Sequence, residues 1–212
     1  TGNTTELGTN NVQINGINNI TKGFNTNCLI NGSENEIANG VKNATVLGVN
    51  GKSNRDGGLV IGGGLNAIGS EQADRKVSVV NLAGVTTDNT ATNLTVNGDG
   101  TNYINVNENS IVGFEIYITR LEVGGSAATL GDYSYRNIKG VVRIGETSGM
   151  AFIVGFTRNI GKIGVNGTAV MVDSTTGGVD SITVQVTDRN NVTNVWSATV
   201  YLHELISTNI RF

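Results

Sequence analysis

A glycine recurs at a nearly constant interval through the first third of the chain. The steps between successive glycines are 8, 7, 9, 8 and 8 residues, for Gly8, Gly16, Gly23, Gly32, Gly40 and Gly48. Each glycine tends to close a short run of β-forming residues and asparagines, as in Val12–Gly16. Self-similarity at a fixed period indicates a stacked-repeat architecture.

The repeating unit is about sixteen residues and contains two short strands. Ile14, Ile30 and Val46 each stand two residues before a glycine and are 16 residues apart. The glycines between these, Gly23 and Gly40, are each preceded three residues earlier by an isoleucine, Ile20 and Ile37. Because side chains alternate along a strand, each half-coil contributes a column of buried β-branched residues, while the glycines supply positive φ angles at the corners. The pattern predicts a narrow β-solenoid.

Composition agrees with this and excludes several classes of protein. The chain has 212 residues with 30 Gly, no Pro, one Cys and 15% charged residues. It is too apolar for ordinary disorder, and the lack of proline suits long hydrogen-bond ladders. No apolar run approaches a membrane span, so we expect no membrane insertion. The net charge of −3 argues against a nucleic-acid partner. Because no charged-then-apolar leader follows Thr1, we expect a fragment or a processed chain.

A coil of sixteen residues cannot bury its own apolar side chains. Stacking and lateral packing against other chains must complete the core. Apolar columns on two faces fit three parallel chains, and cyclic closure is an ordinary solution for extended oligomers. The sequence therefore predicts a homotrimer. Asparagines beside glycines, such as Asn15, Asn31 and Asn39, are expected to serve turns or side-chain ladders.

After Gly69 the pattern changes. Residues 71–76 form the densest charge cluster, which is either a solvated surface loop or an ion-pair girdle between chains. We expect the loop, because exposed pairs contribute little. Strand-like runs resume at residues 77–82, 94–96 and 103–106. Residues 1–109 are thus predicted to form a β-solenoid shaft with an irregular continuation after residue 69.

From Ser110 the chain carries longer alternating runs. Ile111–Glu122 alternates apolar and polar residues, which is typical of a half-buried strand. Five further strands are expected at residues 133–144, 151–157, 168–173, 181–187 and 195–204. Strands at such spacing with no helical period predict a β-sandwich, jelly-roll-like, over residues 110–212. The predicted fold class is all-β. A Gly/Asn-rich β-solenoid, as a trimeric β-roll or β-helix, is followed by the β-sandwich, which forms the tip of the molecule.

Four segments of the second half carry a resemblance, together with the repeat: Tyr133–Arg143, Val170–Ser174, Ser181–Val186 and Trp196–Glu204. They resemble the C-terminal β-domain of phage tail fibres and tailspikes, where a tryptophan precedes an alternating strand with a terminal acidic residue. The repeat also resembles the left-handed β-roll of trimeric autotransporter adhesin heads, although its coils are longer. The resemblance implies an extracellular virion tail appendage that binds a bacterial surface polysaccharide or outer-membrane receptor.

Residues suited to catalysis or to metal binding are few. His203 is the only histidine and Cys28 the only cysteine, so neither a metal site nor a catalytic triad can assemble around them. We expect no metal and no cofactor. A glycosidase needs two facing carboxylates. The candidate carboxylate pairs are Glu34 with Glu36, Glu71 with Asp74, and Glu115 with Glu122. None of these pairs lies on a recognisable concave, aromatic-lined stretch, so we expect no enzymatic activity.

Aromatic residues gather in the second half and could stack on sugar rings. Tyr133 and Tyr135 follow the Gly131–Asp132 turn, which favours their exposure. Trp196 and Tyr201 are further candidates, although Trp196 could instead pack in the core or a trimer interface. The predicted receptor-binding residues are Asp132, Tyr133, Tyr135, Arg136 and Trp196.

Together these patterns predict a homotrimeric phage tail fibre protein that attaches to host bacteria without catalysis, through three equivalent weak sites. Three alternatives stay open at this stage. They are a bacterial trimeric adhesin head, a purely structural or trimerising fibre segment, and a capsule depolymerase.

Overall fold

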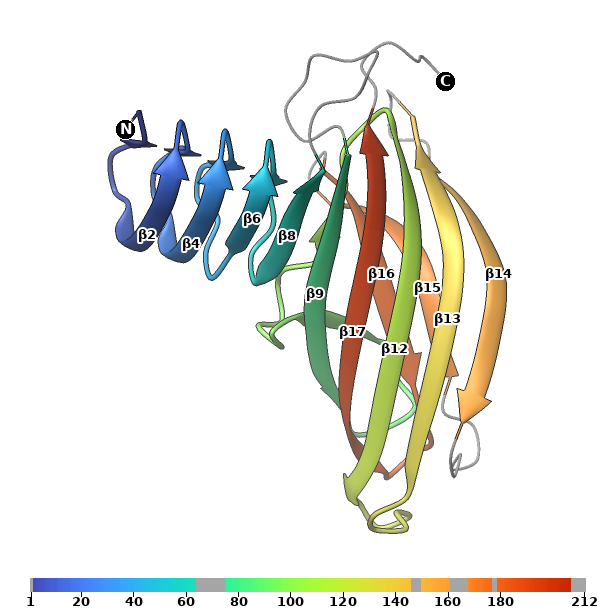
Figure 1. The fold of residues 1–212 in the computed structure, drawn as a ribbon. Helices are drawn as coiled ribbons and strands as arrows, with labels where there is room; N and C mark the ends of the chain where they lie inside the picture. Colours follow the sequence, from blue (N-terminus) through green and yellow to red (C-terminus); the bar gives the residue numbers. More distant parts are fainter. Residues whose placement is uncertain (1, 64–74, 146–149, 161–167, 177–178, 207–212) are drawn as a thin grey trace.

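A computed structural model describes residues 2–63, 75–145, 150–160, 168–176 and 179–206. The regular elements of these residues are all strands, β1 to β17, as Figure 1 shows. The all-β prediction is confirmed. The figure also shows a row of short strands leading into a taller body of long strands.

The first row of strands is a β-solenoid of about four coils, as the sequence predicted. Each coil contributes one strand to each of two parallel sheets. The minor sheet contains β1 (Thr4–Thr5), β3 (Ile20–Thr21), β5 (Glu36–Ile37) and β7 (Lys52–Ser53). The major sheet contains β2 (Asn10–Ile17), β4 (Thr26–Ser33), β6 (Thr45–Val49) and β8 (Gly58–Gly63).

The glycines align from coil to coil because the coils approach too closely for a side chain. Gly16 pairs with Gly32 and Gly32 with Gly48. A Cβ on Gly16 would lie 1.8 Å from the carbonyl oxygen of Gly32, and one on Gly32 would lie 1.8 Å from that of Gly48. Their φ angles of +119° and +141° also favour glycine. The recurrence of glycine at Gly16 and Gly32, sixteen residues apart, is therefore a steric requirement of the stack, whereas a Cβ on Gly40 would meet nothing within 4 Å.

A ladder of buried asparagine side chains fixes the register of the coils. The Oδ1 atoms of Asn3, Asn19 and Asn35 accept hydrogen bonds from backbone N–H groups sixteen residues further on, at 3.0, 3.0 and 2.8 Å. The side-chain amides of Asn19 and Asn35 donate to the carbonyls of Gly32 and Gly48 at 2.9 and 2.8 Å. Asn19 and Asn35 are fully buried.

Of the two roles predicted for the asparagines beside glycines, a turn is observed at Asn39, and a side-chain ladder does form, but through other asparagines. Asn15, Asn31 and Asn39 are all exposed, whereas the buried ladder uses asparagines at other points of the coil. A second, exposed ladder runs through Asn11, Asn27 and Asn43, which all have positive φ angles, with amide contacts at 2.7 and 3.3 Å.

The major sheet of the solenoid continues into the second half of the molecule. β8 pairs with β9 (Arg75–Thr86), and the order onward is β9, β17 (Thr193–Ile206), β12 (Ser110–Gly124), β13 (Tyr133–Ile144) and β14 (Met150–Ile160). A shorter layer lies behind this sheet in Figure 1. It contains β10 (Thr92–Val96), β11 (Ile104–Asn105), β15 (Thr168–Thr176) and β16 (Val179–Thr187).

The two layers of the second half face each other across one apolar core. Phe114 and Ile116 of β12 meet side chains such as Ile182 and Val184 of β16 in this core. Leu94 of β10, together with Val80, Ile104 and others from residues 80–106, belongs to the same core. The sandwich with jelly-roll connectivity stays a prediction beyond these two facing layers.

The predicted domain boundary at residues 109 and 110 falls inside this second core. The other core contains solenoid residues between Cys28 and Val60. Residues 75–106, which the sequence analysis assigned to the shaft, pack with the second half because β9 pairs with β17 along its whole length. We propose that the two units divide between β8 and β9.

A buried ionic cluster joins the last coil to the final strand. Arg55, between β7 and β8, donates two hydrogen bonds to the carboxylate of Glu204 on β17, at 2.7 and 2.5 Å. Its Nε donates to the carbonyl of Asn105. Ser78 donates to Glu204 at 3.0 Å, and the Nζ of Lys76 lies 3.8 Å from the same carboxylate. We call these four side chains (Arg55, Lys76, Ser78 and Glu204) the junction cluster.

The position of Lys76 corrects the expected solvated loop. Lys76 is 4% exposed and takes part in the junction cluster. The rest of the predicted charged loop, apart from Arg75, lies outside the described residues. The resemblance to tailspikes had singled out the terminal acidic residue Glu204 as a pattern, and the structure gives that residue a physical role.

Burial and charge act in opposite directions on the junction cluster. Burial raises the pKa of Glu204, but Arg55 and Lys76 lower it more, to about 2. Burial lowers the pKa of Lys76 to about 8, in spite of its attraction to Glu204. At neutral pH the cluster therefore holds a carboxylate between two cations.

Removal of one rung of the buried ladder should destabilise the solenoid. We expect Asn35→Ala to lower the free energy of unfolding by about 2–4 kcal/mol, because buried backbone groups of Gly48 and Gly51 lose their partners. Asn31→Ala, in the same coil but exposed, should change it by less than about 0.5 kcal/mol. Urea denaturation followed by circular dichroism measures both. Equal effects of the two substitutions would contradict a stabilising role for the ladder.

The junction cluster should make stability depend on acid pH. The folded-state pKa of Glu204 lies below its ordinary value of 4.5, so its contribution is present above pH 4.5 and is lost as the pH falls toward 2. Glu204→Gln should cost about 3–5 kcal/mol at pH 7, because it leaves buried cations without a counter-charge.

The same substitution should flatten the acid limb of a plot of unfolding free energy against pH. Glu6→Gln serves as the control, since Glu6 forms an exposed pair with Lys22. If Glu204→Gln keeps the wild-type acid limb, the carboxylate does not carry this pH dependence.

Candidate functional site

The outer face of the long sheet carries a cluster of polar and aromatic side chains. Along β12, residues such as Ile116 and Ile118 enter the core, so Glu115 and Tyr117 lie on the opposite, outer face. The strand register places Tyr201 of β17 and Lys139 of β13 on either side of Glu115. His203 is two residues from Tyr201 on the same face. These positions come from three strands far apart in the sequence.

Tyr117 lies at the centre of this cluster. Its ring centroid is 5.8 Å from that of Tyr201, in an edge-to-face arrangement at 84°, and 6.1 Å from that of Tyr135. Its hydroxyl donates to Glu115 Oε2 at 2.9 Å, and Lys139 Nζ lies 2.9 Å from Glu115 Oε1. The contacts hold three aromatic rings side by side, with a charged pair at their edge.

The hydrogen bonds also set the protonation of the cluster. The bonds from Lys139 and Tyr117 hold the pKa of Glu115 below its ordinary value. The bond to Glu115 raises the pKa of the Tyr117 phenol. At neutral pH Glu115 is therefore a carboxylate that accepts hydrogen bonds, and Tyr117 keeps its proton.

Two hollows adjoin on this face and share one residue. The smaller, about 220 Å³, is lined by Glu115, Tyr117, Tyr201 and His203. The larger, about 470 Å³, lies where the solenoid meets the second half. Its lining includes His203 together with Ile61, Val77, Leu205 and Arg75. The two hollows together span β12, β17, β9 and β8 of this face, with His203 between them, and we call the pair the outer groove.

The structure separates the predicted receptor-binding residues. Tyr133, 50% exposed, and Tyr135 lie on the outer face, and Asp132 directly precedes them. Arg136 pairs with Ile118, whose side chain is in the core, so Arg136 lies on the inner face. The predicted group is therefore not one surface.

Trp196 corrects one of these predictions. It is 5% exposed, belongs to the core of the second half, and donates its indole N–H to the hydroxyl of Thr86 at 2.9 Å. Its ring is thus unable to stack on a sugar at the surface. Of the two alternatives that the sequence left open for Trp196, packing in the core is the one observed.

Sequence reasoning named Tyr135, Tyr201 and Glu115 as separate candidates, but missed Tyr117, Lys139 and the place of His203. Alternation along each strand already predicts that Glu115 and Tyr117 share a face. The register between β12, β13 and β17 brings the other side chains to them, and nothing in a single sequence states that register.

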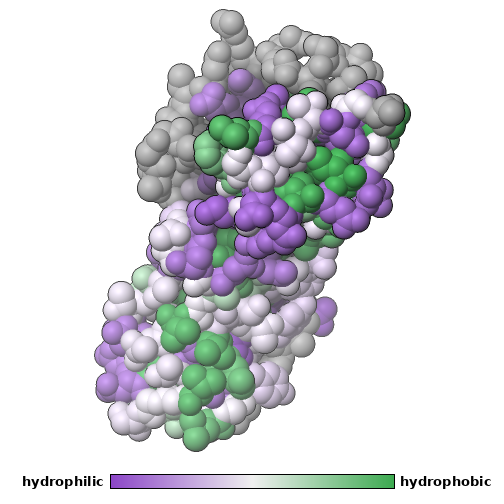
Figure 2. Space-filling view, turned by 90° about the vertical axis from the view of Figure 1, so that its left-hand side faces the viewer, coloured by the Kyte–Doolittle hydropathy of each residue, from purple (hydrophilic) through white to green (hydrophobic). Residues whose placement is uncertain are grey.

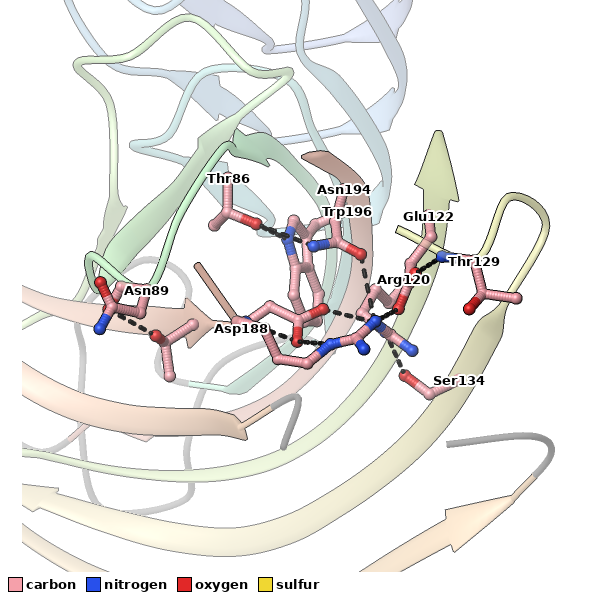
Figure 3. Close-up of polar contacts among 11 residues, drawn as sticks. Thr86, Asn89, Arg120, Glu122, Thr129, Ser134, Asp188, Asn194 and Trp196 are labelled. Carbon is pink, nitrogen blue, oxygen red and sulfur yellow. Dashed lines mark hydrogen bonds and ion pairs between the residues drawn. The ribbon is translucent and has the colours of Figure 1, made fainter. Parts of the chain in front are cut away.

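A second polar cluster lies at the far end of the long strands (Figure 3). Arg120 is fully buried and bonds through Nη1 to Glu122 at 2.8 Å, to Asn194 at 3.2 Å, and to Asp188. Arg189 also contacts Glu122, at 2.5 Å. Glu122 Oε2 accepts the backbone N–H of Thr129 at 2.9 Å, which attaches the β12–β13 hairpin to the core.

The candidate carboxylate pairs do not face each other in the described residues. Glu115 lies on the outer face, and Glu122 on the inner face. Burial raises the pKa of Glu122, but the Thr129 amide and the two arginines lower it more, so it lies below the ordinary value. Glu36 pairs with Lys52 at 2.8 Å, while Glu34 is at an exposed turn. Glu71 and Asp74 lie outside the described residues.

The described part of the chain has neither a metal-binding cluster nor a membrane-spanning helix. It contains no group of three or more His, Cys, Asp or Glu side chains placed to hold a metal ion. Nor does it contain a helix with the length and apolar character needed to cross a membrane.

Similar solved structures include two phage tailspikes, the class that the sequence pattern resembles. No protein-family model and no curated protein matches the chain. The tailspike of Acinetobacter baumannii phage AM24 is 8% identical with a TM-score of 0.29, over 83% of this chain and 33% of that one. Tailspike gp49 of A. baumannii bacteriophage Fri1, a capsular polysaccharide depolymerase, is 9% identical with a TM-score of 0.26, over 91% and 36%.

This chain spans about a third of the length of these tailspikes. The expectation of a protein without enzymatic activity is nevertheless corrected by the comparison. Because gp49 is a depolymerase, a tailspike-like architecture gives no ground for excluding catalysis. At such low TM-scores, the comparison assigns neither an activity nor a substrate to this chain.

Proposed function

We propose that this chain is the receptor-binding part of a phage tail appendage, and that its outer groove binds a bacterial surface polysaccharide. The observation that supports this most is the group of tyrosine rings around Tyr117, held beside a carboxylate–ammonium pair in a shallow groove. Sugar rings offer apolar faces to aromatic planes, and their hydroxyls bond to neighbouring charged groups. Rigid aromatic side chains lose little conformational entropy on binding.

We further propose that three copies associate through an apolar strip at the far end of the second half. Val85, Val195, Leu121 and Tyr133 face one another across four neighbouring strands and are 53%, 40%, 41% and 50% exposed. Figure 2 shows apolar side chains gathered at this end of the molecule. A row without charged groups suits contact between proteins better than contact with a sugar. Three parallel copies would present three grooves to one surface, which raises avidity.

Polysaccharide binding is tested by an array of purified bacterial capsular polysaccharides and O-antigens. We expect at least one to bind, and Tyr117→Ala to weaken that binding at least tenfold. Tyr201→Phe should retain it, because the ring stays in place. If Tyr117→Ala binds like the wild type, the polysaccharide binds outside the outer groove. If no polysaccharide of the array binds, the proposed function is contradicted.

The oligomeric state is tested by light scattering on the purified chain. We expect three copies per particle, and dissociation when Leu121→Asp introduces a charge into the strip. Asn15→Asp adds the same charge to the outer face of the solenoid and should leave the particle intact. A monomeric wild-type chain at micromolar concentration would contradict the proposed assembly.

A further inference from the structure

We propose that Lys76 and Asn54 join through an isopeptide bond, which links the last coil of the solenoid covalently to β9. The bond forms between Lys76 Nζ and the side-chain amide carbon of Asn54, and ammonia is released. This modification is independent of the proposed function, because it concerns the interior of the junction and not the outer groove. It rests on three groups that the fold brings together, which are an amine, an amide and a carboxylate.

The amine belongs to a lysine that is buried in the junction cluster. The side chain of Lys76 is 1% exposed. Its Nζ donates to the carbonyl oxygen of Lys52 at 3.2 Å and to Oδ1 of Asn54 at 3.4 Å. Burial is the main reason that the pKa of Lys76 falls to about 8, although the carboxylate of Glu204 opposes the shift. A lysine amine attacks a carbonyl carbon in its neutral form, which burial favours.

The amide is held with its oxygen toward this amine. Asn54 lies between β7 and β8, and its Nδ2 donates to Oδ1 of Asn107 at 3.0 Å. That hydrogen bond fixes the plane of the amide, so Oδ1 is directed at Lys76 Nζ and the amide carbon is one bond further on. Amides react slowly with amines in water. A fixed approach inside a protein replaces a chance encounter and accelerates such a reaction greatly.

The carboxylate of Glu204 is the proton acceptor for this reaction. Its Oε2 lies 3.8 Å from Lys76 Nζ, and Arg55 holds it in place through hydrogen bonds of 2.7 and 2.5 Å. The carboxylate takes a proton from the ammonium, which frees the Nζ lone pair to form a bond with the amide carbon of Asn54.

The second half of the reaction expels the amide nitrogen of Asn54. Glu204 returns its proton to Nδ2 while the bond between Nδ2 and the amide carbon breaks, and it takes a second proton from Nζ. This second proton leaves with the ammonia as an ammonium ion. One lysine ammonium and one amide thus become one new amide and one ammonium ion, so atoms and charge balance. Arg55 remains as the counter-ion of Glu204 in the linked chain.

Mass spectrometry of the purified whole chain tests the bond directly. We expect an intact mass below the sequence mass by one ammonia, about 17 Da. Digestion with trypsin should yield a branched peptide in which Ser53–Arg55 is attached to Lys76–Arg120, because trypsin cleaves after unmodified lysine and arginine. Ring closure of an asparagine that precedes a glycine removes the same mass but joins no peptides, so the branched peptide distinguishes the two reactions.

Variants assign the reacting groups. Asn54→Ala should remove the branched peptide, whereas Asn31→Ala, the matched change at an exposed asparagine of the solenoid, should keep it. Glu204→Gln should slow formation of the link at least tenfold, because it removes the proton acceptor. The urea midpoint of each variant checks its folding, and the peptide map of the wild type decides the proposal even where a variant is unstable.

Two results would count against this inference. If the folded wild-type chain still gives separate Ser53–Arg55 and Lys76–Arg120 peptides after prolonged incubation at alkaline pH, no bond forms, and Lys76 and Asn54 share a hydrogen bond alone. If a folded Glu204→Gln forms the link at the wild-type rate, its carboxylate is not the proton acceptor. Neither result bears on polysaccharide binding in the outer groove.

Discussion

The close approach of successive coils at their glycines is the constraint on which the rest of the molecule depends. Where a Cβ would lie 1.8 Å from the next carbonyl, as at Gly16 and Gly32, the chain has one register available. That register places Asn19 and Asn35 where each can bond the coils on both sides. Steric exclusion and buried hydrogen bonds therefore select the same stack, which keeps the major sheet regular up to β8.

The regular sheet matters for function because it does not stop at the solenoid. β8 pairs with β9 in the same sheet, and the junction cluster attaches the last coil to the final strand. A buried ion pair is a weak source of net stability but is costly to break. Arg55 and Glu204 thus specify how the solenoid meets the second half. The outer groove lies directly over this meeting point, so its two ends are held by one continuous sheet.

The sequence was sufficient for features that repeat or alternate locally. The sixteen-residue unit, the two-strand coil and the six long strands after Ser110 follow from the spacing of glycines and apolar residues. The sequence predicted a boundary after residue 109; the division that we propose between β8 and β9 could not be predicted, because it depends on β9 pairing with β17 more than a hundred residues later. Trp196 and Arg136 were misplaced for a related reason: strand alternation gives two faces, and only packing decides which is buried.

The direct test of the account is a crystal structure of the chain with an oligosaccharide cut from a polysaccharide that it binds. We expect sugar density in the outer groove, with one ring against Tyr117 and Tyr201. Density instead at the buried Arg120 end, or along the flank of the solenoid, would contradict it. In that case the tyrosine cluster would be a structural feature of the sheet surface.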